Sequence, residues 1–590
     1  MTHVFAKFKW PVLFALVPLV AVLPLPDFWI YQLNYIGLYA LTCLGLVLLT
    51  GVAGLTSFGQ AAFVGIGAYT TAWLTLNLGL SPWLTVLVGL LLTGMSALVV
   101  GVITLRMSGH YLPLATIAWG LSLYYLMGNL EALGKYDGLL GLKSLAIGDF
   151  DIGQGRAFFV LTWLILIAAA LGFTQLLDSR AGRAIRSLKT GTQMAEAMGI
   201  NTFRYKVIIF VLAALLASVA GWLMAHFQRT VNPSAFGLKM GIEYLFMAVV
   251  GGVGHVWGAV VGAGIIKLMD DQLQVLLPKL IGTSGSYEVI VFGVALVLVL
   301  KYLPDGLWSL VAKHMPRSNR QEDWAAADSL DERSKPQHGE PVLDVQAVRK
   351  QFGGLVAVND ISFQIKAGQI VGLIGPNGAG KSTTFNLITG VLPLTAGSVQ
   401  YRGETISGLP SRDIARRGMA RTFQHVKMIP DMTVLENVAM GAYSRGHKGV
   451  VAGLLRTNQA EEQRLFKEAQ RQLQRIGMDH LLHEQAGNLA MGQQRLMEIA
   501  RALCADPALL LLDEPAAGLR HKEKQGLADV LRQLRNEGVS ILLVEHDMDL
   551  VMQVCDHLVV MEFGTLLTQG TPEEIQQSPA VRAAYLGTEH

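Results

Sequence analysis

Long apolar runs separated by short polar segments occupy the first 312 residues of the chain. Most of these runs are long enough to cross about 30 Å of hydrocarbon as a helix. They predict a polytopic α-helical membrane domain over residues 1–312. The apolar windows lie near residues 10–26, 31–50, 57–78, 82–105, 111–129, 157–177, 206–227, 240–269 and 287–303.

The longest window, 240–269, is interrupted by the glycine-rich stretch GGVGHVWG. A broken helix at membrane depth is tolerated where it is buried in protein or lines a cavity. We therefore expect this window to form two crossing or re-entrant pieces, which brings the total to about ten spans.

Basic residues predict the orientation of these spans. The segment 180–206 contains one acid, Glu196, among six bases, which places it on the cytoplasmic side. Six windows precede it, so the N-terminus is expected on the same side. With about ten spans, the polar half that follows is cytoplasmic as well. The six bases are Arg180, Arg183, Arg186, Lys189, Arg204 and Lys206.

Composition changes sharply after the last window. The whole chain of 590 residues is 52% hydrophobic and only 15% charged, whereas residues 313–341 form a charged stretch and 342–590 have the composition of a soluble domain. We expect a flexible cytoplasmic linker followed by a soluble domain. The net charge of +3 is small for this length, and no nucleic-acid partner is expected.

The soluble half contains a phosphate-loop pattern. The apolar strand IVGLI leads into Gly375-x4-Gly380-Lys381-Ser382 and then into a helix, which is the context this motif requires. Backbone N–H groups of such a loop wrap phosphates, the lysine neutralises charge, and the Ser382 hydroxyl binds Mg²⁺. The predicted ATP-binding residues are Gly375, Pro376, Asn377, Gly378, Ala379, Gly380, Lys381, Ser382 and Thr383.

Two further apolar strands end in polar residues. In ALLLLDEP, Asp513 is suited to Mg²⁺ and Glu514 to polarising an attacking water. In SILLVEHDM, His546 follows the strand end, from where it could reach a γ-phosphate. Together with the phosphate loop, these residues predict a magnesium-dependent ATPase with an α/β fold.

This combination resembles the ATP-binding cassette family over essentially all of 342–590. The resemblance implies further roles: Gln424 in RTFQ as the lid glutamine and a Mg²⁺ ligand, and Phe352 as the aromatic that stacks on adenine. It also implies that ATP lies between two cassettes, so that the signature loop acts on the ATP of a partner. The signature corresponds to Leu489, Ala490, Met491, Gly492 and Gln493.

Three positions depart from the pattern of the family, two of them in the signature. Ala490 replaces the serine of the usual LSGGQ signature and Met491 replaces a glycine, while Arg520 stands where an aspartate or asparagine is usual. We expect this signature to be a weaker activator of a partner's ATP.

The cytoplasmic segment contains a candidate coupling helix. The sequence QMAEAM lies between Gly191 and Gly199, and EAMG resembles the EAA-and-glycine motif of bacterial importers. The resemblance implies that Glu196, Ala197 and Gly199 belong to a short helix that docks on the cassette. An ordinary basic loop at the lipid surface is the alternative.

Longer stretches of both halves resemble branched-chain amino acid uptake systems. In the permease these are SFGQAAFVGIGAY, MAVVGGVGHVWGAVVGA and PDGLW, and in the ATPase FGGLVAVNDISF and ARTFQHVKMIPDMTVLENV. The resemblance implies a permease–ATPase fusion in the bacterial inner membrane that imports branched-chain amino acids. A urea or amide importer of the same family and, as a more remote alternative, an exporter half-transporter remain open.

The same resemblance implies the partners. These are a second permease and a second ATP-binding subunit, or a second copy of this chain, together with an extracytoplasmic solute-binding protein. Because selectivity in this family lies largely in the binding protein, the sequence leaves the exact solute open.

Overall fold

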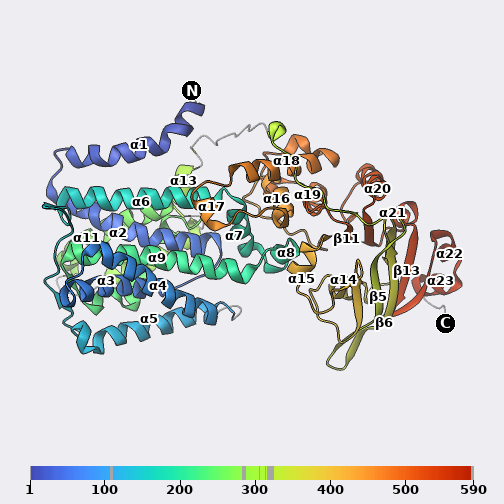
Figure 1. The fold of residues 1–590 in the computed structure, drawn as a ribbon, viewed down its shortest axis with the longest axis horizontal. Coiled ribbons are helices and arrows are strands. Elements are labelled where there is room, and N and C mark those ends of the chain that lie inside the picture. Colours follow the sequence, from blue (N-terminus) through green and yellow to red (C-terminus); the bar gives the residue numbers. More distant parts are fainter. Residues whose placement is uncertain are drawn as a thin grey trace. The chain divides into compact units, whose positions relative to one another are not determined.

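A computed structural model of the chain describes residues 2–106, 111–281, 288–303, 306–312, 314 and 324–586. The chain divides into two compact units, coloured by sequence in Figure 1. One unit contains Met1–Leu177 and Phe203–Ser318, and the other contains Asp178–Thr202 and Asn319–His590. The short cytoplasmic segment predicted from the sequence thus groups with the soluble half.

The first unit is built from helices. Four of its apolar segments are long enough to span a membrane, judged by length and composition: Asp27–Val52, Pro82–Thr104, Gly155–Leu177 and Thr202–Gln228. Within the described residues, ten helices of at least fourteen residues contribute to this unit. They are α1 (Thr2–Val22), α2 (Asp27–Leu46), α3 (Gln60–Asn77), α4 (Pro82–Thr104), α5 (Tyr111–Asn129), α6 (Gly155–Leu177), α9 (Thr202–Gln228), α10 (Leu238–Gly251), α11 (Gly258–Ile281) and α12 (Glu288–Tyr302).

The predicted interruption of window 240–269 is confirmed, since α10 ends at Gly251 and α11 begins at Gly258. The sequence did not reveal a second interruption. After α2 the chain forms a π-helix, Val47–Val52, and then irregular backbone before α3. The two interruptions meet, because a Cβ on Gly51 would lie 1.5 Å from the carbonyl oxygen of Val253. Gly51 and Gly252 are buried at this contact, whereas Gly54, Gly254 and His255 are exposed.

Glycine also allows α3 and α9 to approach closely. A Cβ on Gly67 would lie 2.3 Å from the carbonyl oxygen of Ser218, and one on Gly221 would lie 1.9 Å from that of Val64. Small residues at such crossings let helix backbones pack directly against each other. Gly67, which belongs to the glycine-rich stretch SFGQAAFVGIGAY, thus lies at a close helix crossing.

The second unit contains the cassette, which is built on two sheets. The larger sheet has the strand order β10-β11-β12-β7-β13-β14, and all its neighbours are parallel except the β13–β14 pair. Its strands are β7 (Ile370–Ile374), β10 (Met419–Arg421), β11 (Leu509–Asp513), β12 (Ser540–Val544), β13 (His557–Glu562) and β14 (Thr565–Gly570). The smaller antiparallel sheet contains β5 (Pro341–Phe352), β6 (Leu355–Lys366), β8 (Ala396–Tyr401) and β9 (Glu404–Thr405).

Strands β7, β11 and β12 are adjacent and completely buried. In register, Leu511 lies opposite Leu542, which lies opposite Val371. Strands covered on both faces appear in sequence as continuous apolar runs, which is why all three could be located from IVGLI, LLLL and SILLV. Their carboxyl ends lie at one edge of the sheet, so the polar residues that follow them gather there.

The helices of the cassette fall into two groups. Those around the sheets are α14 (Lys381–Ile388), α15 (Ser411–Arg416), α20 (His521–Asn536), α21 (Met548–Val554), α22 (Pro572–Gln577) and α23 (Pro579–Leu586). The other group shares a hydrophobic cluster of its own and is called here the helical subdomain. It contains α16 (Val434–Ala439), the 3₁₀ helix Met440–Arg445, α18 (Gln459–Arg475) and α19 (Met491–Leu503), and the short α17 (Val450–Leu454) precedes α18 in sequence.

Two helices form the segment that the sequence predicts to be cytoplasmic. The short helix expected between Gly191 and Gly199 is present as α8 (Thr192–Ala197). It is preceded by α7 (Arg180–Thr190), a helix that the basic composition of this segment does not reveal. The Ser179 side chain caps α7 by accepting a hydrogen bond from the Gly182 N–H at 3.2 Å.

The predicted flexible linker, 313–341, is only partly described, because residues 313 and 315–323 lie outside the described residues. Its second part packs on the cassette. Trp324 and Leu330 are buried in the helical subdomain, and Arg333 donates from its backbone N–H to Asp506 at 2.6 Å. This second part is therefore an ordered strap on the cassette, in contrast to the flexible segment expected from its charged composition.

Candidate functional site

The phosphate loop joins β7 to α14. Gly375, Gly378 and Gly380 all have positive φ angles, of 149°, 82° and 92°. A Cβ on Gly375 would lie 2.1 Å from the carbonyl oxygen of Met561, and one on Gly380 would lie 2.7 Å from that of Ala357. Glycine is thus required at both positions, by backbone conformation and by the neighbouring strands.

Lys381 is the first residue of α14 and is buried. Its Nζ donates to the carbonyl oxygens of Gly375 at 2.7 Å and Pro376 at 2.9 Å, so the lysine is held inside its own loop. Burial lowers the pKa of Lys381, against the opposing pull of Glu514 and Asp513. A desolvated cation at a helix N-terminus is suited to bind a phosphate. Asn377, Gly378 and Ser382 are exposed around it.

Asp513 ends β11 beside this loop. Its backbone N–H donates to the Thr422 hydroxyl at 3.1 Å, while the carboxylate oxygen Oδ1 is buried and has no hydrogen-bond partner within the described residues. Burial raises the pKa of Asp513, and the nearby Arg421 opposes that shift. An orphaned, buried carboxylate oxygen is a fitting ligand for a hard divalent cation. Asp513 therefore fits the role of a Mg²⁺ ligand.

Glu514, Gln424 and His546 come together from three separate segments. Oε1 of Glu514 lies 3.0 Å from Nε2 of His546 and accepts a hydrogen bond from Nε2 of Gln424 at 3.2 Å. Glu514 itself has a positive φ of 50°, which is uncommon for a residue with a side chain. Such strain is typical of positions where the surrounding structure fixes a functional group.

Three residues that support this group were not singled out from the sequence. Glu545, which is buried, accepts from the backbone N–H groups of Ala516 at 2.6 Å and His546 at 2.8 Å. Arg495 on α19 donates to the carbonyl oxygen of Phe423 at 2.6 Å and also to that of Gln424. Thr422 is the third. An acid directly before His546 was the available signal for Glu545, whereas nothing local marks Arg495.

Phe352 ends β5 with 44% of its surface exposed. The Nζ of Lys350 lies 4.9 Å from the centroid of its ring, on the same strand. An exposed aromatic face beside a cation can stack on a base. This position is thus compatible with the adenine contact implied by the family resemblance.

The signature residues lie at the start of α19. The Gln493 side chain accepts from the Ala490 N–H at 3.0 Å, and Gln494 donates to the carbonyl oxygen of Leu489 at 2.8 Å. Gly492 is buried, whereas Met491 is 61% exposed. Among the described residues, no hydrogen bond joins Leu489–Gln493 to the phosphate loop. Arg520, also exposed, precedes α20.

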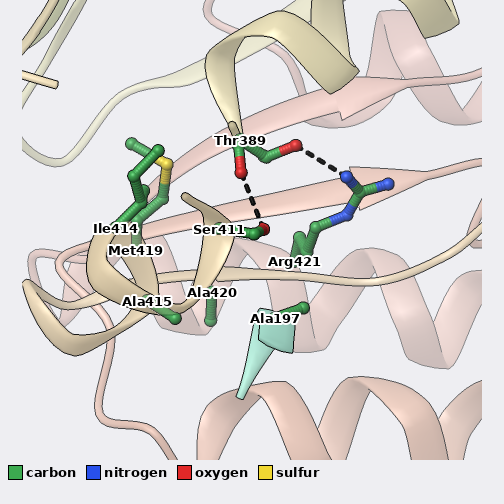
Figure 2. Close-up of a pocket in the computed structure, with 8 residues that line it drawn as sticks. All are labelled: Ala197, Thr389, Ser411, Ile414, Ala415, Met419, Ala420 and Arg421. Atoms are coloured by element: carbon green, nitrogen blue, oxygen red, sulfur yellow. Dashed lines mark hydrogen bonds between the residues drawn. The ribbon is translucent and has the colours of Figure 1, made fainter. Parts of the chain in front are cut away.

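The coupling-helix candidate α8 lies against the cassette within the second unit. Arg416 on α15 donates from Nε to the carbonyl oxygen of Gly199 at 3.1 Å, and Thr202 donates to Glu196 at 2.8 Å. Figure 2 shows Ala197 facing a small pocket in the cassette. The pocket is lined by Ala197, Thr389, Ser411, Ile414, Ala415, Met419, Ala420 and Arg421.

Two arginines, the half-buried Arg421 and the buried Arg501, connect α8 with both parts of the cassette. Arg421, in the pocket, donates to the Asn386 side chain at 3.0 Å and to the Thr389 hydroxyl at 2.6 Å, both on or just after α14. Arg501 on α19 donates to the Lys427 carbonyl at 2.5 Å and contacts the sulfur of Met194 on α8 at 3.4 Å. One face of α8 thus touches residues joined to the phosphate-loop helix, and another touches the helix that carries the signature.

The arginines on α19 share one acid. Glu498 lies 3.2 Å from Arg501 and 3.6 Å from Arg495, and all three are buried. Burial raises the pKa of Glu498 to about 7, against the opposing charges of Arg501 and Arg495. The cluster fixes the two arginines along the same helix.

In the first unit, buried polar residues differ in how well they are satisfied. His226 contacts the Thr71 hydroxyl at 2.8 Å and the Lys143 carbonyl at 2.9 Å, which supports a structural role. Gln60, in contrast, is fully buried, and both polar atoms of its side chain lack a partner within the described residues.

Comparisons with known proteins match both halves of the chain. Residues 29–300 match a family model described as "Branched-chain amino acid transport system / permease component". Residues 358–517 match "ABC transporter", and residues 565–590 match "Branched-chain amino acid ATP-binding cassette transporter". The permease and cassette matches thus follow one another in a single polypeptide.

Individual relatives match the cassette half. The high-affinity branched-chain amino acid transport ATP-binding protein LivG of Salmonella typhimurium is 46% identical over 252 residues, which are 42% of this chain and 98% of the relative. BraF of Pseudomonas aeruginosa, described in the same words, is 43% identical over 250 residues, again 42% of this chain and 98% of the relative. A crystal structure of a nucleotide-free cassette from an ABC transporter is 30% identical, with a TM-score of 0.38, and covers 42% of this chain and 99% of that one.

Replacing the two central groups should separate nucleotide binding from turnover. We expect Glu514→Gln to retain ATP binding but to lower ATP turnover by about a hundredfold or more, because it removes the carboxylate placed between Gln424 and His546. Lys381→Ala should instead weaken ATP binding by about tenfold or more, because it removes a positively charged group that donates hydrogen bonds to a phosphate. Nucleotide binding and phosphate release by the purified complex measure the two effects. Wild-type turnover in Glu514→Gln would contradict the assignment.

A bulky residue at Gly199 should disturb the contact between α8 and the cassette. Gly199 has a φ of 82°, and a Cβ there would lie 3.2 Å from Cγ of Arg416 and 3.3 Å from Cβ of Ser444. We therefore expect Gly199→Val to abolish solute-stimulated ATP turnover while ATP binding persists.

The matched control is Gly538→Val. Gly538 has a similar φ of 84°, but no atom lies within 4 Å of the position of its Cβ. Both variants carry the same backbone strain, so Gly538→Val should lower thermal stability without uncoupling. Equal uncoupling by the two variants would show that strain alone accounts for the effect.

Proposed function

Because the chain belongs to the branched-chain amino acid ABC transporter family and fuses the permease of that family to its ATPase, we propose that it imports branched-chain amino acids, driven by ATP. A related small polar solute such as urea or an amide is the alternative within the family. The observation that carries the proposal is the position of α8. This helix, from the segment between α6 and α9, is seated on the same cassette that brings Glu514, Gln424 and His546 together.

The cassette hydrolyses ATP, and we assign roles to its residues. Gly375–Thr383 wrap the phosphates, Lys381 neutralises their charge, and Phe352 stacks on adenine. Glu514 orients and deprotonates the attacking water, and His546 contacts the γ-phosphate. Ser382, Gln424 and Asp513 would hold Mg²⁺, which supplies charge stabilisation when bound. Gln424 and His546, both hydrogen-bonded to Glu514, hold its carboxylate in place.

The assembly follows from the signature. Leu489–Gln493 act on ATP bound by a second cassette, which is either a different subunit or a second copy of this chain. The complex further contains a second permease and an extracytoplasmic solute-binding protein. We place it in the bacterial inner membrane, with residues 1–312 as the permease, 313–341 as the connection and 342–590 as the cytoplasmic cassette. Within the described residues, four helices of at least fourteen residues, α9, α10, α11 and α12, follow α8 before the cassette, which supports about ten spans.

An exporter half-transporter is the less favoured function. In the described residues the coupling segment consists of two short helices, α7 and α8, and the membrane unit has ten helices of at least fourteen residues, several of which contain glycines at close helix contacts. Exporters have neither feature, because they use six long helices that continue into extended cytoplasmic loops.

Uptake by the purified complex tests the proposed function. We expect vesicles containing the complex and its binding protein to accumulate labelled leucine, isoleucine or valine when ATP is supplied on the cassette side. Glu514→Gln should stop accumulation, because turnover is lost. Labelled urea serves as the competing solute, and preferential uptake of urea would select the alternative. ATP-driven movement in the opposite direction would identify an exporter.

The altered signature predicts unequal nucleotide sites. A hydroxyl contact to a charged phosphate contributes about 1.5–3 kcal/mol, equivalent to roughly tenfold or more in rate. The site around Lys381 is completed by the signature of the partner cassette. If that partner is a different subunit with a serine in its signature, the site around Lys381 stays active and Ala490 weakens only the partner's site. We expect Ala490→Ser to raise the ATP turnover of the assembled complex. Unchanged turnover would mean that the backbone N–H groups at Gly492 suffice.

A further inference from the structure

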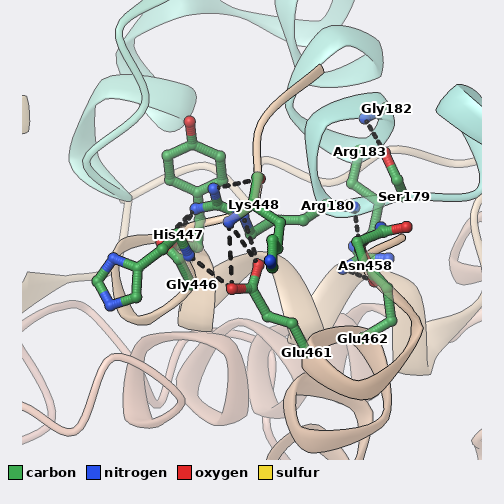
Figure 3. A network of polar contacts seen from close by, with 11 residues as sticks. Ser179, Arg180, Gly182, Arg183, Gly446, His447, Lys448, Asn458, Glu461 and Glu462 are labelled. Atoms are coloured by element: carbon green, nitrogen blue, oxygen red, sulfur yellow. Dashed lines mark hydrogen bonds and ion pairs between the residues drawn. The ribbon is translucent and has the colours of Figure 1, made fainter. Parts of the chain in front are cut away.

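A second docking contact, separate from α8, joins α7 to the helical subdomain (Figure 3). Arg180 is buried at the start of α7, and its guanidinium donates to three backbone carbonyl oxygens of one loop: Tyr443 at 2.6 Å, Gly446 at 2.8 Å and Lys448 at 2.7 Å. It also lies 4.5 Å from the centroid of the Tyr443 ring. The planar guanidinium, with five donors in a fixed fork, is suited to bind several carbonyls and stack on a ring at the same time.

Glu461 on α18 shapes the loop that receives Arg180. Its carboxylate accepts from the backbone N–H groups of His447 at 2.7 Å and Lys448 at 3.1 Å. With these N–H groups bound from one side, the carbonyls of the loop are free to face Arg180. A carboxylate oxygen of Glu461 also lies 3.4 Å from Nε of Arg180, so Glu461 neutralises the positive charge of the Arg180 guanidinium that the loop binds.

Glu462, the next residue, receives α7 directly. One carboxylate oxygen accepts from the Arg180 backbone N–H at 2.5 Å and from Asn458 at 2.9 Å, and the other accepts from Arg183 at 2.7 Å. The Arg183 guanidinium also lies 4.8 Å from the Phe466 ring. Its side chain is 3% exposed and that of Glu462 is 12% exposed, so the pair is largely desolvated. Buried pairs of this kind are sensitive to the loss of either partner.

The junction between α7 and α8 has the features of a hinge. It is Gly191, with φ 144° and ψ 127°, and no atom lies within 4 Å of the position of its Cβ. Glycine is therefore required here by the backbone conformation, since a side chain at this position would meet no neighbouring atom. On one side of it α7 is bound to the helical subdomain, and on the other α8 contacts Arg416 and lies beside Arg421.

We propose that the buried contact of Arg180 and Arg183 with Glu461, Glu462 and the loop 443–448 is a second coupling joint, through which the helical subdomain moves α7 independently of α8. The proposal rests on the proposed function and extends it. Only Asp178 and Ser179 separate α7 from the end of α6. Displacement of α18 would therefore act directly on the chain that leaves a membrane helix, and α8 would respond separately across Gly191.

Charge exchange tests this joint in the full complex. We expect Arg183→Glu to lower solute-stimulated ATP turnover and uptake at least tenfold, because it places a second negative charge next to Glu462 in a desolvated site. The double variant Arg183→Glu with Glu462→Arg should recover a substantial part of both. Lys189→Glu, an exposed change of the same charge on the same helix, is the matched control and should behave as wild type. Wild-type coupling in Arg183→Glu, or no recovery in the exchange, would overturn the proposal.

Hydrogen exchange gives a readout that does not depend on the solute. In the wild-type complex, ATP with orthovanadate should change the amide protection of α7. Arg183→Glu should lose that change while binding ATP normally, and the exchanged pair should regain it. If wild-type vesicles took up no solute but α7 still followed this pattern, the proposed function would fail and the joint would stand. An α7 that does not respond to ATP in a complex that transports would refute the joint alone.

Discussion

Arg180, Arg495 and Arg501 are buried, and each donates to backbone carbonyls of a loop that carries or contacts a functional group. A guanidinium stays charged when buried and has five donors to satisfy. Backbone carbonyls that accept from the same guanidinium are therefore held in fixed positions relative to one another, as the carbonyls of Phe423 and Gln424 are by Arg495. The geometry of the cassette's irregular segments depends on these contacts, because the segments have no sheet or long helix of their own to hold them.

Helix α19 combines several of these connections. It begins at the signature, holds the Phe423–Gln424 backbone through Arg495, and contacts Lys427 and Met194 through Arg501. The shared acid Glu498 lies against both arginines, so a movement of α19 would carry with it the backbone of Phe423–Gln424 and of Lys427. A rigid helix with two fixed side chains is a physical basis for coupling that needs no long chain of contacts.

The elements predicted from sequence are those whose signal is local. Buried parallel strands gave continuous apolar runs, and the polar residue after each run located Asp513, Glu514 and His546. Flanking glycines located α8. Helix α7 was missed because Arg180 and Arg183 have the appearance of solvated charges, and their partners lie about 280 residues away in sequence. The π-helix after α2 was missed because an apolar run carries no mark of altered hydrogen bonding.

The charged contacts of α7 also bear on why such groups are kept in a fused chain. Joining two binding partners in one polypeptide raises their effective concentration, so the contact needs little intrinsic affinity to form. Buried ion pairs contribute less net stability than apolar packing of the same volume, but their geometry discriminates strongly between registers. For a joint that must hold one arrangement of α7 on α18 while α8 adjusts across Gly191, defined register is the more useful property.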